Sequence, residues 1–274
     1  MADPYRMSLN VATVRQQWDL GQMIQGCVRH GITGIAPWRD KLQDYGVERA
    51  AQEIRAAELT VTSLCRGGMF TAADKAGRQA ALEDNRRAVD EALAIGARCL
   101  VLVVGGMPAG SKDLPGARQQ VLDGIHALLE YARRAAMPLA IEPLHPMYAA
   151  DRACINTVGQ ALDCCDALGA GVGVAVDVYH VWWDPDLETQ IRRAGPDRLL
   201  GFHVCDWLVP TRDLLLDRGM MGDGVIDIPL IRHWMEGAGF DDLIEVEIFS
   251  RDNWWQRDPD QVLATCLERF PESV

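Results

Sequence analysis

Short apolar runs alternate along the chain with longer stretches of helical periodicity. Residues 99–106 form a nearly continuous apolar run, which is typical of a parallel strand buried on both faces. From Leu20 to His30 the apolar residues have helical spacing instead, and Gly31 follows as a stop signal. The expected strands are 8–13, 32–38, 60–68, 99–106, 138–144, 172–178, 199–205 and 243–249. The expected helices are 20–30, 47–59, 76–95, 115–136, 157–168, 187–194, 228–238 and 259–270.

These elements make eight strand–helix units without a linker or a low-complexity break. That order predicts an α/β fold, a single (β/α)₈ TIM barrel, with residues 1–274 as one domain. A doubly wound open sheet is the alternative. It is weaker because no Gly-x-Gly-x-x-Gly motif follows the first expected strand.

The last four expected strands each carry an acid or an imidazole at the downstream end. These residues are Glu142, Asp177, His203 and Glu247. Taken singly, such a carboxylate often caps a helix or pairs with an arginine, and a lone histidine is often a hydrogen-bonded core residue. In a barrel, however, the carboxyl ends of the strands converge on one mouth. Two glutamates, one aspartate and one histidine there would suit Mn²⁺, Co²⁺, Mg²⁺ or Zn²⁺.

Charge and composition narrow the function classes. The 274 residues carry a formal charge of −12, from 39 acids against 27 lysines and arginines, which disfavours nucleic-acid binding. No apolar run approaches the ~20 residues of a membrane span, and the N-terminus lacks the apolar core of a signal peptide. Most of the eight cysteines lie in apolar runs and none forms a CxxC motif, so we expect free thiols in a cytoplasmic protein.

The four ligand-type residues stand in specific motifs. Glu142 lies in Ile-Glu-Pro, His203 in Phe-His-Val-Cys-Asp and Glu247 in Glu-Val-Glu-Ile. Asp177 begins Asp-Val-Tyr-His180, and Arg218 precedes a glycine-rich loop that ends at Gly224. With these motifs, essentially the whole chain resembles the xylose isomerase-like TIM-barrel superfamily, the sugar phosphate isomerase/epimerase group.

The resemblance implies roles for these residues. It implies a metal site made of Glu142, Asp177, His203 and Glu247, with Mn²⁺ as the expected ion and Co²⁺, Mg²⁺ or Zn²⁺ as alternatives. Glu142 and Glu247 would also be the catalytic acid/base pair. His180 and Arg218 would bind substrate.

The chain departs from the epimerase pattern in two places. The segment from His203 to Arg218 is longer, and His145 follows Glu142 after two residues. The second feature resembles the metal-bearing subunit of bacterial C-glycoside deglycosidases, in which a histidine is the base of an elimination. Trp38 and Arg66 also resemble that branch, and together with Trp183 they are candidate substrate-binding residues.

Two functions therefore remain open from the sequence. The first is a divalent-metal-dependent isomerase or epimerase that acts on a sugar or keto-sugar through a metal-stabilised enediolate. The alternative is a lyase that cleaves 3-keto C-glycosides, with His145 as base. A small-molecule sugar or keto-glycoside is the expected partner, without nucleic acid or membrane, and a homo-oligomer or a small second subunit is compatible with either function.

Overall fold

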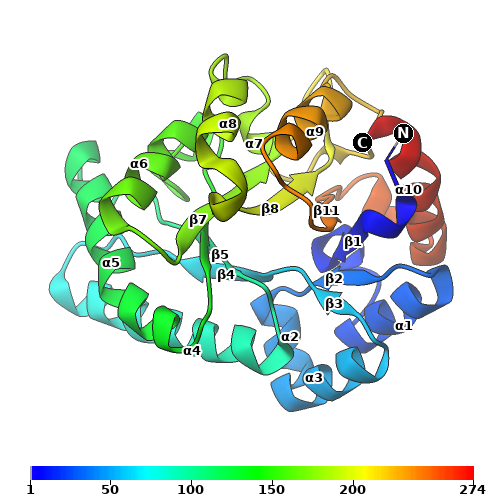
Figure 1. Ribbon diagram of the computed structural model, residues 1–274, viewed down its shortest axis with the longest axis horizontal. Coiled ribbons are helices and arrows are strands. Elements are labelled where there is room, and N and C mark those ends of the chain that lie inside the picture. The colour runs from blue at the N-terminus through cyan, green and yellow to red at the C-terminus, as the bar shows by residue number, and fades with distance from the viewer. Residues whose placement is uncertain (1) are drawn as a thin grey trace.

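Parallel strands curve into a barrel that the helices surround (Figure 1). The computed structural model describes residues 2–274, and within them the strand order is β3-β2-β1-β11-β8-β7-β6-β5-β4. The barrel strands are β1 (Met7–Asn10), β2 (Gly34–Ala36), β3 (Thr60–Val61), β4 (Leu64–Gly68), β5 (Leu100–Val103), β6 (Leu139–Ile141), β7 (Val172–Asp177), β8 (Leu199–Val204) and β11 (Ile244–Val246). The (β/α)₈ barrel expected from the sequence is confirmed.

The third barrel strand is interrupted, which turns eight strand positions into nine strands. β3 pairs with β2, and β4 pairs with β5. Thr62 and Ser63 separate β3 from β4, and a parallel bridge between Trp38 and Cys65 continues the pairing across the interruption. The sheet is therefore almost closed on itself.

Helices cover the outside of the barrel. They are α1 (Leu20–His30), α2 (Arg39–Tyr45), α3 (Val47–Ala56), α4 (Lys75–Ile95), α5 (Leu114–Arg134), α6 (Val158–Leu168), α7 (Val178–Val181), α8 (Leu187–Arg198), α9 (Ile228–Gly237) and α10 (Pro259–Ser273). The boundaries of α1 follow from local chemistry. Asp19 and Gln22 form a capping box at its start, and Gly31 ends it in the left-handed conformation, with φ 69°. None of the helices in residues 2–274 is both long and apolar enough to cross a membrane.

Strand β7 shows why the apolar runs fold as they do. All six of its residues are buried, because the barrel interior lies on one side and helices lie on the other. Its last residue, Asp177, reaches the mouth of the barrel. The same layout brings the ends of β6, β8 and β11 to that mouth.

Several elements differ from the sequence expectation. The first strand ends at Asn10 rather than at residue 13, because the Asn10 side chain accepts a hydrogen bond from the amide of Ala12 and starts a 3-10 turn. Helix α2 was not expected. The long segment after β8 forms an antiparallel pair of short strands, β9 (Asp206–Trp207) and β10 (Arg218–Gly219).

Candidate metal centre and cavity

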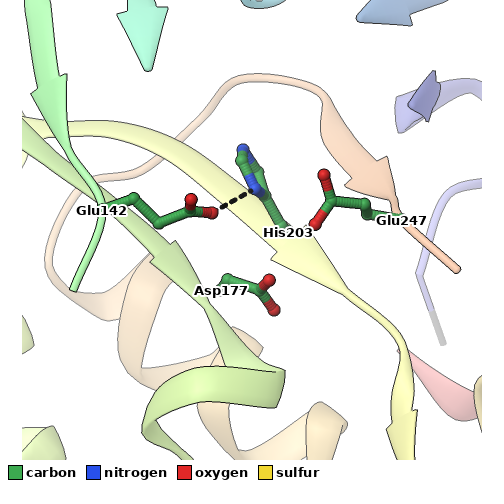
Figure 2. A group of neighbouring side chains, drawn as sticks. All are labelled: Glu142, Asp177, His203 and Glu247. Carbon is green, nitrogen blue, oxygen red and sulfur yellow. Dashed lines mark ion pairs between the residues drawn. The ribbon is translucent and has the colours of Figure 1, made fainter. Parts of the chain in front are cut away.

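Four acidic and imidazole side chains converge at the mouth of the barrel (Figure 2). Glu142 directly follows β6, Asp177 ends β7, His203 lies in β8 and Glu247 directly follows β11. All four are buried, and one ligand atom from each lies within 4.8 Å of the others. Figure 2 shows Glu142 and Glu247 approaching from opposite sides, with His203 and Asp177 between them.

The hydrogen bonding of the His203 ring tests whether a cation fits this cluster. Its side chain is fully buried, yet neither ring nitrogen makes a hydrogen bond of acceptable geometry to any of residues 2–274. Nδ1 lies 3.3 Å from Glu142 Oε1. Buried polar atoms are normally satisfied, and a neutral imidazole beside carboxylates is a typical metal ligand. The donor set therefore fits a divalent cation held by Glu142, Asp177, His203 and Glu247.

Arg218, from β10, fixes the two carboxylates on one side of the cluster. Its Nη1 lies 3.0 Å from both Asp177 Oδ2 and Glu247 Oε2. Its guanidinium carbon stacks 4.4 Å from the centre of the Tyr179 ring. The second terminal nitrogen of the guanidinium, Nη2, lies 3.3 Å from His180 Nε2. One buried arginine thus holds two of the four ligand-type side chains in place.

Burial and charge set the protonation states of the cluster. Burial raises the pKa of Glu247 to about 8, although Arg218 opposes the shift. Burial alone would raise the pKa of Asp177, but the positive charge of Arg218 holds it below its ordinary value. Burial alone would lower the pKa of His203, yet Glu245 and Glu142 hold it well above its ordinary value. Without a cation, Glu247 is therefore an uncharged carboxylic acid and His203 a positively charged imidazolium at neutral pH.

These shifts predict a pH-dependent metal affinity. A cation must displace the protons on Glu247 and His203, so raising the pH towards about 8 removes one of the competing protons. The Mn²⁺ association constant should rise by about tenfold per pH unit for each proton released. Titration calorimetry of the metal-free protein between pH 6 and 9 measures this, and a constant affinity over that range would contradict it.

A cavity of about 190 Å³ opens beside the cluster. It is lined by Arg15, Trp38, Arg66, Val103, Glu142, Leu144, Tyr148, Arg152, His180, Leu215, Arg218, Glu247 and Phe249. Four of the five substrate-binding residues expected from the sequence are therefore on its wall, namely Trp38, Arg66, His180 and Arg218. Their contact with substrate stays a prediction.

His145 and Trp183 lie outside the residues that line this cavity. The His145 ring stacks on Trp207 at 5.2 Å between ring centres and meets Trp183 edge-on at 5.6 Å. Its Nδ1 accepts a hydrogen bond from the amide of Met147, and burial lowers its pKa. The backbone amide of His145 also donates to His180 Nδ1. This packing connects His145 to the site through His180, and its role as the base of an elimination stays a prediction.

Glu245 is a functional candidate that the sequence interpretation missed. It is buried inside the barrel, and its Oε2 lies 3.3 Å from His203 Nε2, on the side of the ring that faces away from Glu142. Asn10 and Thr62 hold the carboxylate with hydrogen bonds of 3.0 and 2.7 Å. The alternation Glu245-Val-Glu247 was the available signal, because it places a second carboxylate on the same inward face of the strand.

We expect Glu245→Gln to lower the affinity for Mn²⁺ by about 10–100-fold, because a carboxylate on the far nitrogen orients a ligating histidine and strengthens it as a donor. Titration calorimetry measures the change, and Glu188→Gln on exposed α8 is the matched control. An unchanged affinity in Glu245→Gln would show that the carboxylate only satisfies Asn10 and Thr62.

Comparison with known proteins adds a family context. The sequence profile described as xylose isomerase-like TIM barrel matches residues 24–267. A crystal structure of a protein from Sinorhizobium meliloti 1021 is 59% identical, with a TM-score of 0.97 and 99% of each chain covered. Inosose isomerase of Bacillus velezensis is 22% identical over 96% of this chain and 95% of its own. The crystal structure of 3-keto-D-glucoside 4-epimerase from E. coli is 18% identical, with a TM-score of 0.76, and the match covers 96% of this chain and 97% of that one.

Proposed function

Because the chain belongs to the xylose isomerase-like TIM-barrel family, we propose that it is a divalent-metal-dependent isomerase or epimerase of a sugar or keto-sugar. One observation carries the proposal. Two buried glutamates face each other across a cluster that fits a cation, and both also line a cavity. A protein that only binds a sugar needs no such pair of acid/base groups.

The glutamates have the roles of base and acid in this proposal. Bound in the cluster, a divalent cation would supply Lewis-acid polarisation of a substrate carbonyl. One glutamate takes the proton from the carbon next to that carbonyl, and a proton returns either from this glutamate or from the glutamate on the opposite side after that one has taken a proton from solvent. Return to the other face of the same carbon gives an epimer, and return to the neighbouring carbon gives an isomer.

The remaining cavity residues bind and orient the substrate. Burial lowers the pKa of His180 to about 3, so it is a neutral imidazole. Its Nδ1 accepts a hydrogen bond from the His145 amide, which leaves the N–H on Nε2 to donate to a substrate hydroxyl. Trp38 offers an aromatic face for a sugar ring, and its Nε1 is fixed by Asn10 Oδ1 at 2.9 Å. We propose Mn²⁺ as the ion, because the mixed carboxylate and imidazole donor set suits it.

The similarity to inosose isomerase and to 3-keto-D-glucoside 4-epimerase supports a polyhydroxylated ketone as the substrate. We also propose that residues 1–274 form one domain in the cytoplasm. The support for this location is that all eight cysteines are free thiols.

Metal analysis and proton exchange test the proposal together. Protein purified without chelator should contain about one divalent ion per chain. In D₂O it should incorporate deuterium next to the carbonyl of at least one ketone among D-fructose, an inosose and a 3-keto-glucoside, as measured by NMR. A 3-keto C-glycoside in the same panel tests the lyase alternative, because elimination releases the aglycone. Metal-free protein with full exchange activity in EDTA would refute the proposed function.

A further inference from the structure

Two arginines on the cavity wall lack a close acidic partner. In the described part of the chain, Arg66 makes neither a hydrogen bond nor an ion pair with a carboxylate, although it lines the cavity. The nearest ion-pair contact of Arg152 is Asp151 at 3.8 Å, and both of those side chains are substantially solvent-exposed. The other two cavity arginines differ, since Arg218 pairs with Asp177 and Glu247, and Arg15 pairs with Asp40.

The two guanidinium groups also repel each other. Burial and the neighbouring Arg152 lower the pKa of Arg66, and Glu142 opposes that shift. An arginine remains protonated in a protein, so both groups stay charged. Two like charges at one cavity wall repel each other, and an anion between them or in front of them would offset this repulsion.

We propose that Arg66 and Arg152 bind an anionic group of the substrate, a carboxylate or a phosphate. The inference rests on the proposed function, because the same cavity contains Glu142 and Glu247. A guanidinium binds either anion through paired hydrogen bonds. A sugar hydroxyl could accept one of these bonds but would leave the repulsion between the two arginines in place.

The overall charge of the protein opposes the approach of an anion. A chain with a formal charge of −12 repels an approaching anion at long range. Local positive charge at the cavity is therefore required for an anionic substrate, whereas a neutral sugar would need none. A larger groove of about 450 Å³ adjoins the cavity and shares Arg15, Trp38 and Arg66 with it, so the substrate can extend past the arginines.

Calorimetry with three related ketoses tests the proposal. Mn²⁺-loaded protein is titrated with D-fructose, D-fructose 6-phosphate and D-fructuronate, and inorganic phosphate is a fourth probe. Wild type should bind at least one of the anionic ketoses about 10–100-fold more tightly than D-fructose, as expected for hydrogen bonds to a charged group. The phosphate and carboxylate arms identify which anion is preferred.

Substitutions then assign the preference to the two arginines. Arg66→Gln and Arg152→Gln should each lower the affinity for the preferred anion by about tenfold or more beyond any loss of affinity for D-fructose. Arg66→Lys, which keeps the positive charge, should retain part of the affinity for the preferred anion. Arg134→Gln on the exposed face of α5 is the control, and thermal unfolding shows whether each variant folds.

Equal affinity for D-fructose and both anionic ketoses, or an equal loss for neutral and anionic ligands in the variants, would overturn the inference. Metal content and deuterium exchange are measured on the same samples. Stoichiometric metal with exchange on a neutral ketose and without anion preference would leave the proposed function standing alone. Anion preference in a protein that holds no metal and does not exchange would support the anion site and refute the proposed function.

Discussion

Glu247→Gln should slow deuterium exchange on an accepted ketose by about 10²–10⁴-fold, the usual contribution of a positioned general base. Glutamine keeps the shape of the side chain and its hydrogen bond from Arg218 but cannot accept the substrate proton. Burial gives Glu247 a pKa of about 8 in the metal-free site, which shows how poorly solvated its charge is. NMR in D₂O measures the exchange rate.

Metal binding must be separated from proton transfer in this experiment, because Glu247 also belongs to the cluster that fits the cation. The variant is therefore assayed at saturating Mn²⁺ with its metal content determined. Glu268→Gln on α10 is the control, since that side chain is exposed and remote from the barrel mouth. A Glu247→Gln protein that holds Mn²⁺ and exchanges at the normal rate would exclude Glu247 as the base.

Arg218→Leu should lower the free energy of unfolding of the metal-free protein by about 3–5 kcal/mol, because it leaves two buried carboxylates without their cation. Arg218 lies 3.0 Å from both Asp177 and Glu247, and all three side chains are almost fully buried. The loss should be larger at pH 9 than at pH 6. Below about pH 8 Glu247 is protonated and needs a positive partner less, whereas above it both carboxylates are charged.

Urea unfolding at the two pH values measures this change. Arg192→Leu is the control, because Arg192 pairs with Glu188 on the exposed surface of α8, where such a pair contributes about 0–1 kcal/mol. Added Mn²⁺ should restore part of the stability of Arg218→Leu, since a divalent cation also neutralises the carboxylates. Equal losses in the two variants would show that Arg218 is not the main counter-charge of the site.

Local patterns in the sequence were sufficient to predict the barrel. The apolar runs predicted all eight strand positions because a strand covered on both faces is apolar along most of its length, as β7 is up to Asp177 at its end. The parallel order then placed Glu142, Asp177, His203 and Glu247 at the same end, and the structure brings their ligand atoms together. That part of the site depends only on strand direction and on position along each strand.

Only the tertiary structure decided how other side chains meet this cluster. The contact of Glu245 with His203 joins neighbouring strands inside the barrel, and its support from Asn10 and Thr62 comes from residues 235 and 183 positions away. The packing of His145 against Trp207 depends on the path of the segment between β9 and β10.

At the start of that segment, the carboxylate of Asp206 in β9 accepts hydrogen bonds from the amides of Gly222, Gly224 and Ile226, which follow β10, and these bonds hold β10 and Arg218 over the barrel mouth. The sequence determined which strands form the barrel and which of its ends holds the acids, because short-range periodicity encodes burial. It did not determine which charged groups pair, because those contacts join residues that are distant in the chain and some of them lie on loops.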